Sequence, residues 1–288
     1  MLTNRSKGIL CIIGSAFGFA VMGMCVRWAD FHGDYISSFQ KSFFRNLVAV
    51  LIAALLFLRG SGPSTIRQVS RKGWTVLLLR SFCGTMGIYC NFYALSHIPL
   101  GDAMTLNKLA PFFTVLFSWL FIREKISLRQ ALCVVGAFVG AMFVVKPGFA
   151  GVALFPALMG LVGGFCAGSA YACVRELGLM KVDSRLIVFV FSTFSCLSSV
   201  PFLLFDYHPM TVAQVAILVG TGVGAAIGQF GITFAYRFAP AREIAVYDYT
   251  NILFSALLGF LMFGQLPDVY SWFGFVLIVA MALVMRRA

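Results

Sequence analysis

The sequence predicts an all-α integral membrane protein of ten transmembrane helices, arranged as two inverted five-helix repeats with both termini in the cytoplasm. Of its 288 residues, 60% are hydrophobic and 11% are charged, which is more apolar surface than one soluble core of this size can hide. The apolar runs have helix length and are not alternating strands of about ten residues. Because lipid cannot satisfy backbone polar groups, we expect a helical bundle and not a barrel.

The first half contains five apolar runs, each close to the roughly 20 residues of one crossing. We place these spans at 8–28, 36–58, 74–95, 103–122 and 129–145. The first run follows Arg5 and Lys7 as a signal peptide would, but it lacks a clean small-residue cleavage site and is interpreted as a retained span. The fifth run is short, so a total of nine spans is the alternative.

The second half also contains five apolar runs. We place them at 151–174, 184–205, 212–235, 243–263 and 269–286. The connections alternate between basic and acidic, as the positive-inside rule requires when the number of spans is correct. Cytoplasmic segments would hold sixteen Lys and Arg residues: Arg5, Lys7, Arg59, Arg67, Arg71, Lys72, Arg123, Lys125, Arg129, Arg175, Lys181, Arg185, Arg237, Arg242, Arg286 and Arg287.

The opposite connections are acidic. They hold one basic residue, Lys146, and five acids: Asp30, Asp34, Asp102, Asp206 and Asp268. This distribution accounts for the net charge of +12, and the basic residues form no continuous stripe with exposed aromatic residues, so we expect no nucleic-acid partner. We expect a multi-pass protein of the cell inner membrane.

An internal duplication links the two halves. Shifting the chain by 141 residues aligns 87–121 with 228–262 without a gap and matches six positions: Gly87 with Gly228, Ala94 with Ala235, Pro99 with Pro240, Phe113 with Phe254, Leu116 with Leu257, and Leu120 with Leu261. An odd number of crossings inverts the second copy. We therefore assign residues 1–148 to one repeat and 149–288 to the other.

Two stretches resemble a known family. Residues 95–130, LSHIPLGDAMTLNKLAPFFTVLFSWLFIREKISLRQ, with VVKPG at 144–148, are similar to the EamA type of the drug/metabolite transporter superfamily, and so is FAPAREIAVYDYTNILFSALLGFLMFGQLPD at 238–268. The resemblance covers nearly the whole chain. It implies ten helices in two inverted repeats around a central cavity, and it does not name the solute.

The residues of common enzyme and metal sites are missing. His32, His97 and His208 all fall in exterior connections, and the chain contains no HExxH, GxSxG or GxxxxGK[ST] motif. The eight cysteines lie inside apolar runs with no CxxC and no metal-ligand spacing to histidine. We therefore expect no enzyme activity, no metal and no cofactor.

Charged residues inside the membrane are costly and are the first candidates for function. The deep cations are Lys41, Arg45, Arg80 and Lys108, and the one clearly intramembrane acid is Asp248. Lys41 and Arg45 share a helix face because they stand four residues apart. Asp248 could bind a solute ammonium group or take up a proton. The structural alternative is an ion pair of Asp248 with Arg80, Arg45 or Lys108.

Polar residues of both repeats extend this candidate site. Pro111 removes the hydrogen bond to the carbonyl of Asn107, and the 141-residue shift places Asp248 at the position of Asn107 and Tyr249 at that of Lys108. We predict a substrate site of Arg45, Asn91, Asn107, Lys108, Tyr247, Asp248 and Asn251, with Lys41, Arg80 and Tyr249 as secondary candidates.

Glycines recur with GxxxG spacing, at Gly14 and Gly18, Gly136 and Gly140, Gly164 and Gly168, and Gly220, Gly224 and Gly228. Such spacing permits close helix packing. In a ten-helix protein we favour packing within one chain over a dimer seam, and both a monomer and a homodimer remain open.

The function predicted from these features is secondary transport of a small polar solute by alternating access, with proton coupling or exchange as options. Cations outnumber acids four to one among the deep charges, which favours an amino acid, a carboxylate or a similar zwitterion or anion. The alternatives are a cationic amine or drug-like solute, an intramembrane enzyme, or a channel. The expected partners are the solute and membrane lipid.

Overall fold

A computed structural model describes residues 3–60, 64–122, 127–145, 153–238 and 245–287. The helices in chain order are α1 (Asn4–Ala29), α2 (Ser38–Gly60), α3 (Ser64–Arg67), α4 (Arg71–His97), α5 (Leu100–Asn107), α6 (Ala110–Ile122), α7 (Leu128–Val145), α8 (Leu154–Leu179), α9 (Ser184–Phe205), α10 (Val212–Phe238), the 3₁₀ segment η1 (Ala245–Tyr249), α12 (Thr250–Phe263) and α13 (Val269–Arg287).

The protein is an all-α membrane protein of ten helices, when the four-residue α3 is left out and α5 with α6 and η1 with α12 each count as one interrupted helix. Within the described ranges, five helices are long and apolar enough to cross a membrane by length and composition: α1, α2, α8, α9 and α10. Helix α4 has similar length but carries Arg80 near its middle.

The span predicted at 103–122 is interrupted in the structure. Helix α5 ends at Asn107 and α6 begins at Ala110. Pro111 has no N–H to give to the carbonyl of Asn107, and the chain instead tightens through bonds from the Lys108 N–H to the Thr105 carbonyl and from the Leu109 N–H to the Leu106 carbonyl. The break therefore falls beside the predicted site residues.

The ninth helix is irregular at the corresponding place. The sequence predicts a span at 243–263, of which the structure describes 245–263: residues Ala245–Tyr249 form a 3₁₀ turn, and the α-helix starts at Thr250. Under the 141-residue shift the end of this turn, Tyr249, corresponds to Lys108 in the first break. Both halves thus interrupt the same helix at the same position.

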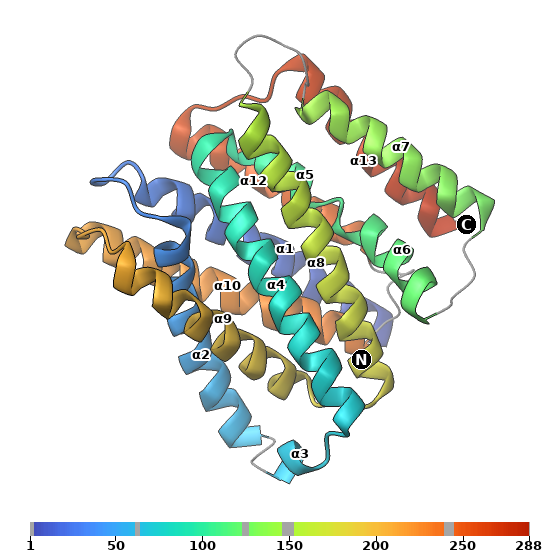
Figure 1. Ribbon diagram of the computed structural model, residues 1–288. Helices are drawn as coiled ribbons and strands as arrows, with labels where there is room; N and C mark the ends of the chain where they lie inside the picture. The colour runs from blue at the N-terminus through green and yellow to red at the C-terminus, as the bar shows by residue number, and fades with distance from the viewer. Residues whose placement is uncertain (1–2, 61–63, 123–126, 146–152, 239–244, 288) are drawn as a thin grey trace.

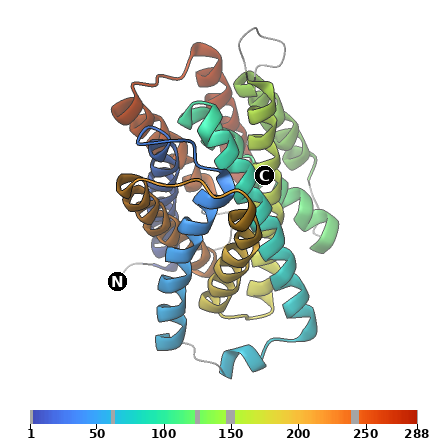
Figure 2. The ribbon, with the colours of Figure 1, turned by 60° about the vertical axis from the view of Figure 1, so that its left-hand side comes forward.

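Helix contacts repeat when the two halves are exchanged. Helix α1 packs along α10, and α4 packs along α8, while α2 lies against α9 and α7 against α13 (Figures 1 and 2). Between the two halves, α1 corresponds to α8 and α4 corresponds to α10. The α1–α10 contact therefore corresponds to the α8–α4 contact. The arrangement agrees with two copies of one five-helix unit, and it places the two interrupted helices in contact with each other.

Most of the GxxxG glycines pack against other helices of the same chain, as predicted. A Cβ at Gly18 would lie 2.8 Å from the backbone nitrogen of Gly228, and one at Gly164 would lie 2.6 Å from the carbonyl oxygen of Leu106. Gly164 therefore lets α8 approach the broken α5–α6 segment. Gly14 is different, because nothing lies within 4 Å of its added Cβ.

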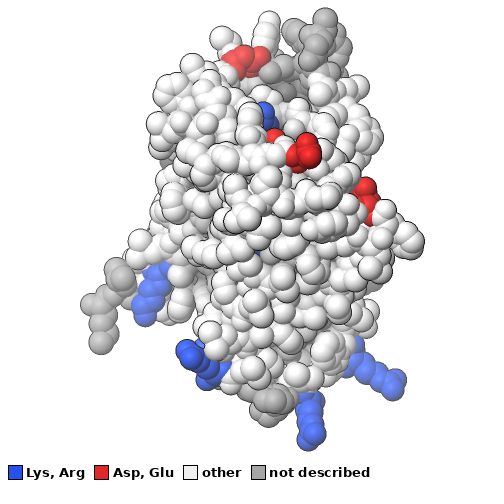
Figure 3. Space-filling view, turned by 90° about the vertical axis from the view of Figure 1, so that its left-hand side faces the viewer, with Lys and Arg blue, Asp and Glu red and all other residues white. Residues whose placement is uncertain are grey.

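Charged side chains separate along the bundle. On the face shown in Figure 3, most Lys and Arg side chains gather toward one end, and the Asp and Glu side chains lie toward the other, where a basic group is also visible. Four cations used in the predicted topology, Arg123, Lys125, Lys146 and Arg242, lie outside the described residues.

Candidate functional site

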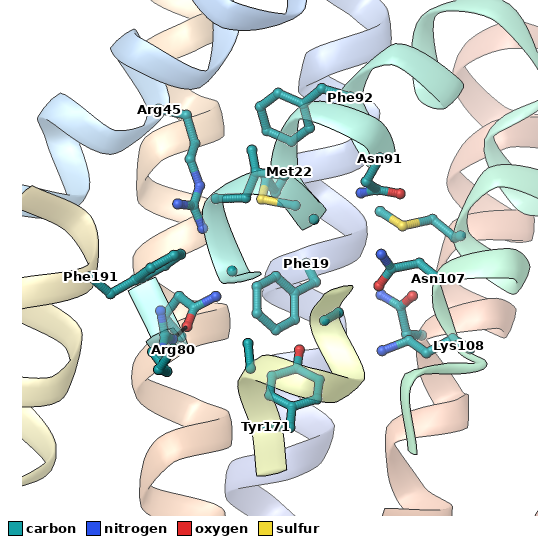
Figure 4. A pocket seen from close by; sticks show the side chains of 18 residues that line it. Phe19, Met22, Arg45, Arg80, Asn91, Phe92, Asn107, Lys108, Tyr171 and Phe191 are labelled. Atoms are coloured by element: carbon teal, nitrogen blue, oxygen red, sulfur yellow. Dashed lines mark hydrogen bonds between the residues drawn. The ribbon is translucent and has the colours of Figure 1, made fainter. Parts of the chain in front are cut away.

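A central cavity of about 70 Å³ lies between the two halves of the bundle (Figure 4). Its lining comes from α1, α2, α4 and α5 of the first half and from α8, α9, α10 and α12 of the second. The polar and charged lining residues are Arg45, Arg80, Asn91, Asn107, Lys108, Tyr171, Gln229 and Asn251. Phe19, Met22, Phe92, Met104 and Phe191 supply large apolar side chains to the same wall.

An ion pair joins the two interrupted helices. Lys108, in the break between α5 and α6, donates from Nζ to Asp248 Oδ2 at 2.7 Å. Asp248 belongs to the 3₁₀ turn before α12, and both side chains are buried. Burial of two charges is tolerated because each compensates the other. The pair is therefore a contact between equivalent breaks of the two halves.

Arg45 of α2 and Arg80 of α4 are buried without such compensation. No ion pair among the described residues involves either guanidinium group. Arg45 donates from Nη1 to Asn46 Oδ1, and Arg80 donates from Nη2 to Gln229 Oε1 at 3.0 Å. Both groups line the cavity and lie beside the same Phe191 ring. The cavity wall thus keeps positive charge that the described carboxylates do not neutralise.

Asn91 and Asn107 line the opposite side of the cavity from the two arginines (Figure 4), and Asn251 also lines the cavity. Asn251 donates from Nδ2 to the carbonyl of Ala16 at 2.6 Å, which anchors α12 to α1. Within the described structure, the Oδ1 atoms of Asn91 and Asn251 have no hydrogen-bond donor. Amide oxygens of this kind accept hydrogen bonds from N–H or O–H groups.

Comparison with known proteins decides the family. Residues 6–146 and 154–287 match the EamA-like transporter family. The chain belongs to the EamA-like transporter family. Membership makes it a membrane transporter of small metabolites and not an enzyme.

Relatives of this EamA-like transporter cover nearly its whole length. The chain is 32% identical over 289 residues to the pseudopaline exporter of Pseudomonas aeruginosa (strain UCBPP-PA14), covering 100% of this chain and 98% of the exporter. It is 25% identical over 278 residues to the riboflavin transporter of Vibrio cholerae serotype O1, covering 95% and 90%. A solved structure described only as the crystal structure of a protein superposes with a TM-score of 0.66 at 20% identity, covering 94% and 96%, and supports the fold alone.

Six of the ten residues predicted from the sequence line the cavity of this EamA-like transporter: Arg45, Asn91, Asn107, Lys108, Asn251 and the secondary candidate Arg80. Asp248 does not line the cavity, but it forms an ion pair with Lys108, which does line it. The structural alternative of an ion pair thus occurs with one of its three suggested partners.

The other three predicted residues lie elsewhere. Tyr247 packs against the small cluster of Ile12 and Ala235, and Tyr249 is buried in the main core with its ring against Phe112. Lys41 pairs with Asp30 at 2.5 Å and donates to Ser96 Oγ at 2.6 Å. Because Asp30 caps the end of α1, Lys41 links helix ends rather than lining the cavity.

Gln229, Tyr171 and Phe191 are among the lining residues that were not predicted. Gln229 lies within the apolar run 212–235, where a polar amide is a signal of the same kind as the predicted asparagines. Tyr171 and Phe191 carry no comparable signal, because aromatic residues are ordinary in an apolar helix. Phe191 nevertheless stacks on Arg80, whose guanidinium carbon lies 3.6 Å from the ring centroid.

The cavity can solvate a few small polar groups but cannot hold a metabolite as it stands. Its volume of about 70 Å³ exceeds the roughly 10–15 Å³ needed for one water and falls short of the roughly 300–1,000 Å³ of typical ligand pockets. Solute entry therefore requires helices or side chains around it to move. No group of three or more His, Cys, Asp or Glu in the described ranges is placed to hold a metal ion.

Proposed function

We propose that the chain is a secondary transporter that carries an anionic or zwitterionic metabolite through the central cavity. The observation that carries this proposal is the pair Arg45 and Arg80, both buried at the cavity wall without a carboxylate partner among the described residues. A buried charge without compensation is costly. A solute carboxylate would supply that compensation and gain strong charge-assisted hydrogen bonds.

Alternating access is the mechanism that this geometry supports best. The solute path would run between two inverted repeats, residues 1–148 and 149–288, and the cavity takes its lining from both. Transporter sites commonly form near the membrane midplane where interrupted helices of two repeats meet. Here the α5–α6 break and the η1–α12 junction meet through Lys108 and Asp248. Rocking of one repeat against the other would expose the cavity to each side in turn.

The proposed orientation places both termini in the cytoplasm and the protein in the inner membrane. Support comes from the sixteen cations assigned to cytoplasmic segments against Lys146 alone on the other side. The separation of basic and acidic side chains along the bundle agrees with this orientation.

The ion pair bears on both solute charge and coupling. Asp248 is the intramembrane acid that could have attracted a cationic amine, and Lys108 already neutralises it. This pairing favours an anion or zwitterion over a purely cationic solute. A proton or a solute ammonium group could compete with Lys108 for Asp248, which is the basis we propose for proton coupling or exchange. The named relatives, an exporter of pseudopaline and a transporter of riboflavin, agree with transport of a small metabolite.

The test is thermal stabilisation of the purified protein by a panel of carboxylates, amino acids and amines, because a ligand that binds only the folded state raises its apparent stability. We expect acids and zwitterions to raise the melting temperature of the parent and to lose this effect in Arg80→Gln. The control Lys72→Gln alters an exposed cation that pairs with Glu176 far from the cavity wall, so it should respond as the parent does. Stabilisation by amines alone would overturn the proposal.

A further inference from the structure

The two cavity arginines approach one aromatic ring from different helices. The guanidinium carbon of Arg80 lies 3.6 Å from the centroid of the Phe191 ring, and that of Arg45 lies 5.8 Å from the same centroid. Figure 4 shows the ring between the two guanidinium groups. The arginines therefore form two neighbouring positive positions separated by a ring, and not one clamp around a single point.

Each guanidinium group is held in place by its own neutral partner. Asn46 accepts from Arg45 and is itself fixed by bonds from its Nδ2 to the Ser42 carbonyl at 2.8 Å and to Ser195 Oγ at 2.7 Å. Gln229 of α10 accepts from Arg80 at 3.0 Å. These amide oxygens orient the guanidinium groups but do not neutralise their positive charges.

Donors remain on both arginines after these bonds. Within the described structure, Nε of Arg45 and both Nε and Nη1 of Arg80 have no acceptor. The side chains of both residues are more than nine-tenths buried. Gly84 makes room for this arrangement, since a Cβ there would lie 2.8 Å from the Phe191 ring and 3.2 Å from Arg80 Nη1. The site is therefore built for acceptors that come from outside the protein.

Charge compensation decides how many acidic groups the solute needs. Lys108 and Asp248 neutralise each other, so Arg45 and Arg80 leave the cavity with two positive charges. One carboxylate at Arg80 would leave Arg45 uncompensated, and the Phe191 ring stands where a bridging carboxylate would have to lie. Two buried like charges also repel each other across a low dielectric.

We propose that the solute carries two separate acidic groups, one for Arg45 and one for Arg80, with its remaining polar groups facing Asn91 and Asn251. This inference rests on the proposed function, because it assigns the substrate class of the same cavity. A dicarboxylate and an amino dicarboxylate both meet the requirement. A monocarboxylate of the same size fills the same space and leaves one guanidinium group without a counter-charge.

The experiment compares acids that differ in one carboxyl group and hardly in size. The purified full-length protein is titrated with succinate and succinamate, with glutamate and glutamine, and with adipate and adipamate, and its melting temperature is recorded. In at least one pair we expect the diacid to reach half of its maximal stabilisation at a concentration at least about tenfold below that of the monoamide, which corresponds to about 1.4 kcal/mol of binding free energy.

Two single variants show whether the second acidic group is what Arg45 and Arg80 recognise. In Arg45→Gln and in Arg80→Gln, the diacid should lose its tenfold advantage and stabilise the protein no better than the monoamide does. Lys72→Gln, at the exposed pair with Glu176, should keep the parent's preference.

The outcomes separate this inference from the proposed function. Equal responses to diacid and monoamide, both abolished by Arg80→Gln, would overturn the two-acid inference and leave an anion transporter. A response to amines and to no acid would overturn both. Absence of a response to every diacid would also contradict the inference, because its charge requirement would then be wrong for all the spacings tested.

Discussion

Lys108 Nζ lies 2.7 Å from Asp248 Oδ2, and this bond joins the two points at which equivalent helices of the two halves are interrupted. Under the 141-residue shift, Asp248 corresponds to Asn107 and Lys108 to Tyr249. The contact therefore joins the second residue of the pair Asn107 and Lys108 to the first residue of the equivalent pair, Asp248 and Tyr249. The symmetric contact, between Asn107 and Tyr249, has no charges to pair. The second half supplies the acid and the first half the base.

Breaking this ion pair should destabilise the protein. In Asp248→Asn the buried ammonium group of Lys108 loses its counter-charge, and we expect the free energy of unfolding to fall by about 3–5 kcal/mol. The measurement is chemical unfolding in detergent. The double variant Lys108→Gln, Asp248→Asn removes both charges and should recover part of the loss. A double variant as unstable as the sum of the two single variants would show that the two residues do not interact.

Replacing a cavity arginine should remove solute binding and change the free energy of unfolding little. In Arg80→Gln a buried charge without an ion-pair partner is removed together with its contact on the Phe191 ring, and these effects offset each other. We expect the free energy of unfolding to stay within about 1 kcal/mol of the parent, measured by the same unfolding assay, while solute stabilisation is lost. A fall of about 3 kcal/mol or more would mean that Arg80 is a structural group.

Lys41 should matter for stability and not for solute binding. Its ammonium group is bound to Asp30 and Ser96 at the helix ends, and it does not line the cavity. In Lys41→Gln we expect a lower melting temperature and an unchanged half-maximal solute concentration in the thermal assay. An altered solute concentration dependence would place Lys41 on the binding path and would contradict its separation from the site.

Two glycines of α1 provide a matched test of helix packing. A Cβ at Gly18 meets backbone atoms of α10 at 2.8 and 2.9 Å, whereas one at Gly14 meets nothing within 4 Å. Gly18→Ala should therefore lower the free energy of unfolding by about 1–3 kcal/mol through overpacking. Gly14→Ala should leave stability unchanged or raise it by up to about 1 kcal/mol through helix propensity. Equal effects of the two substitutions would contradict the close approach of α1 and α10.

Most of the fold could be predicted from the sequence because its spans are long, apolar and bounded by charges. Arg80, Gly84, Gly87 and Asn91 all line the cavity, since one regular helix keeps residues at this spacing on one side. Helix periodicity fails where the helix itself is not regular. The span predicted at 103–122 is interrupted, because the loss of one N–H at Pro111 ends α5 at Asn107.

The same limit explains the two tyrosines. Residues Ala245–Tyr249 form a 3₁₀ turn, in which successive side chains advance by about 120° and not by the 100° of an α-helix. Tyr247 and Tyr249 therefore point in other directions, relative to Asp248, than they would in an α-helix. Phe191 could not be predicted, because its role arises from stacking on Arg80, a contact between α9 and α4 that no local pattern records. The assignment of the cavity residues to the solute stays a prediction.

Counterflow in proteoliposomes tests the central claim, that an acidic solute is carried through a cavity charged by Arg45 and Arg80. Vesicles are loaded with an unlabelled acid from the binding panel, and entry of the same labelled acid is followed with the parent, Arg80→Gln and Lys72→Gln. We expect accumulation of label with the parent and with Lys72→Gln and none above empty vesicles with Arg80→Gln. Equal accumulation in all three proteins, or accumulation of amines alone, would contradict the account.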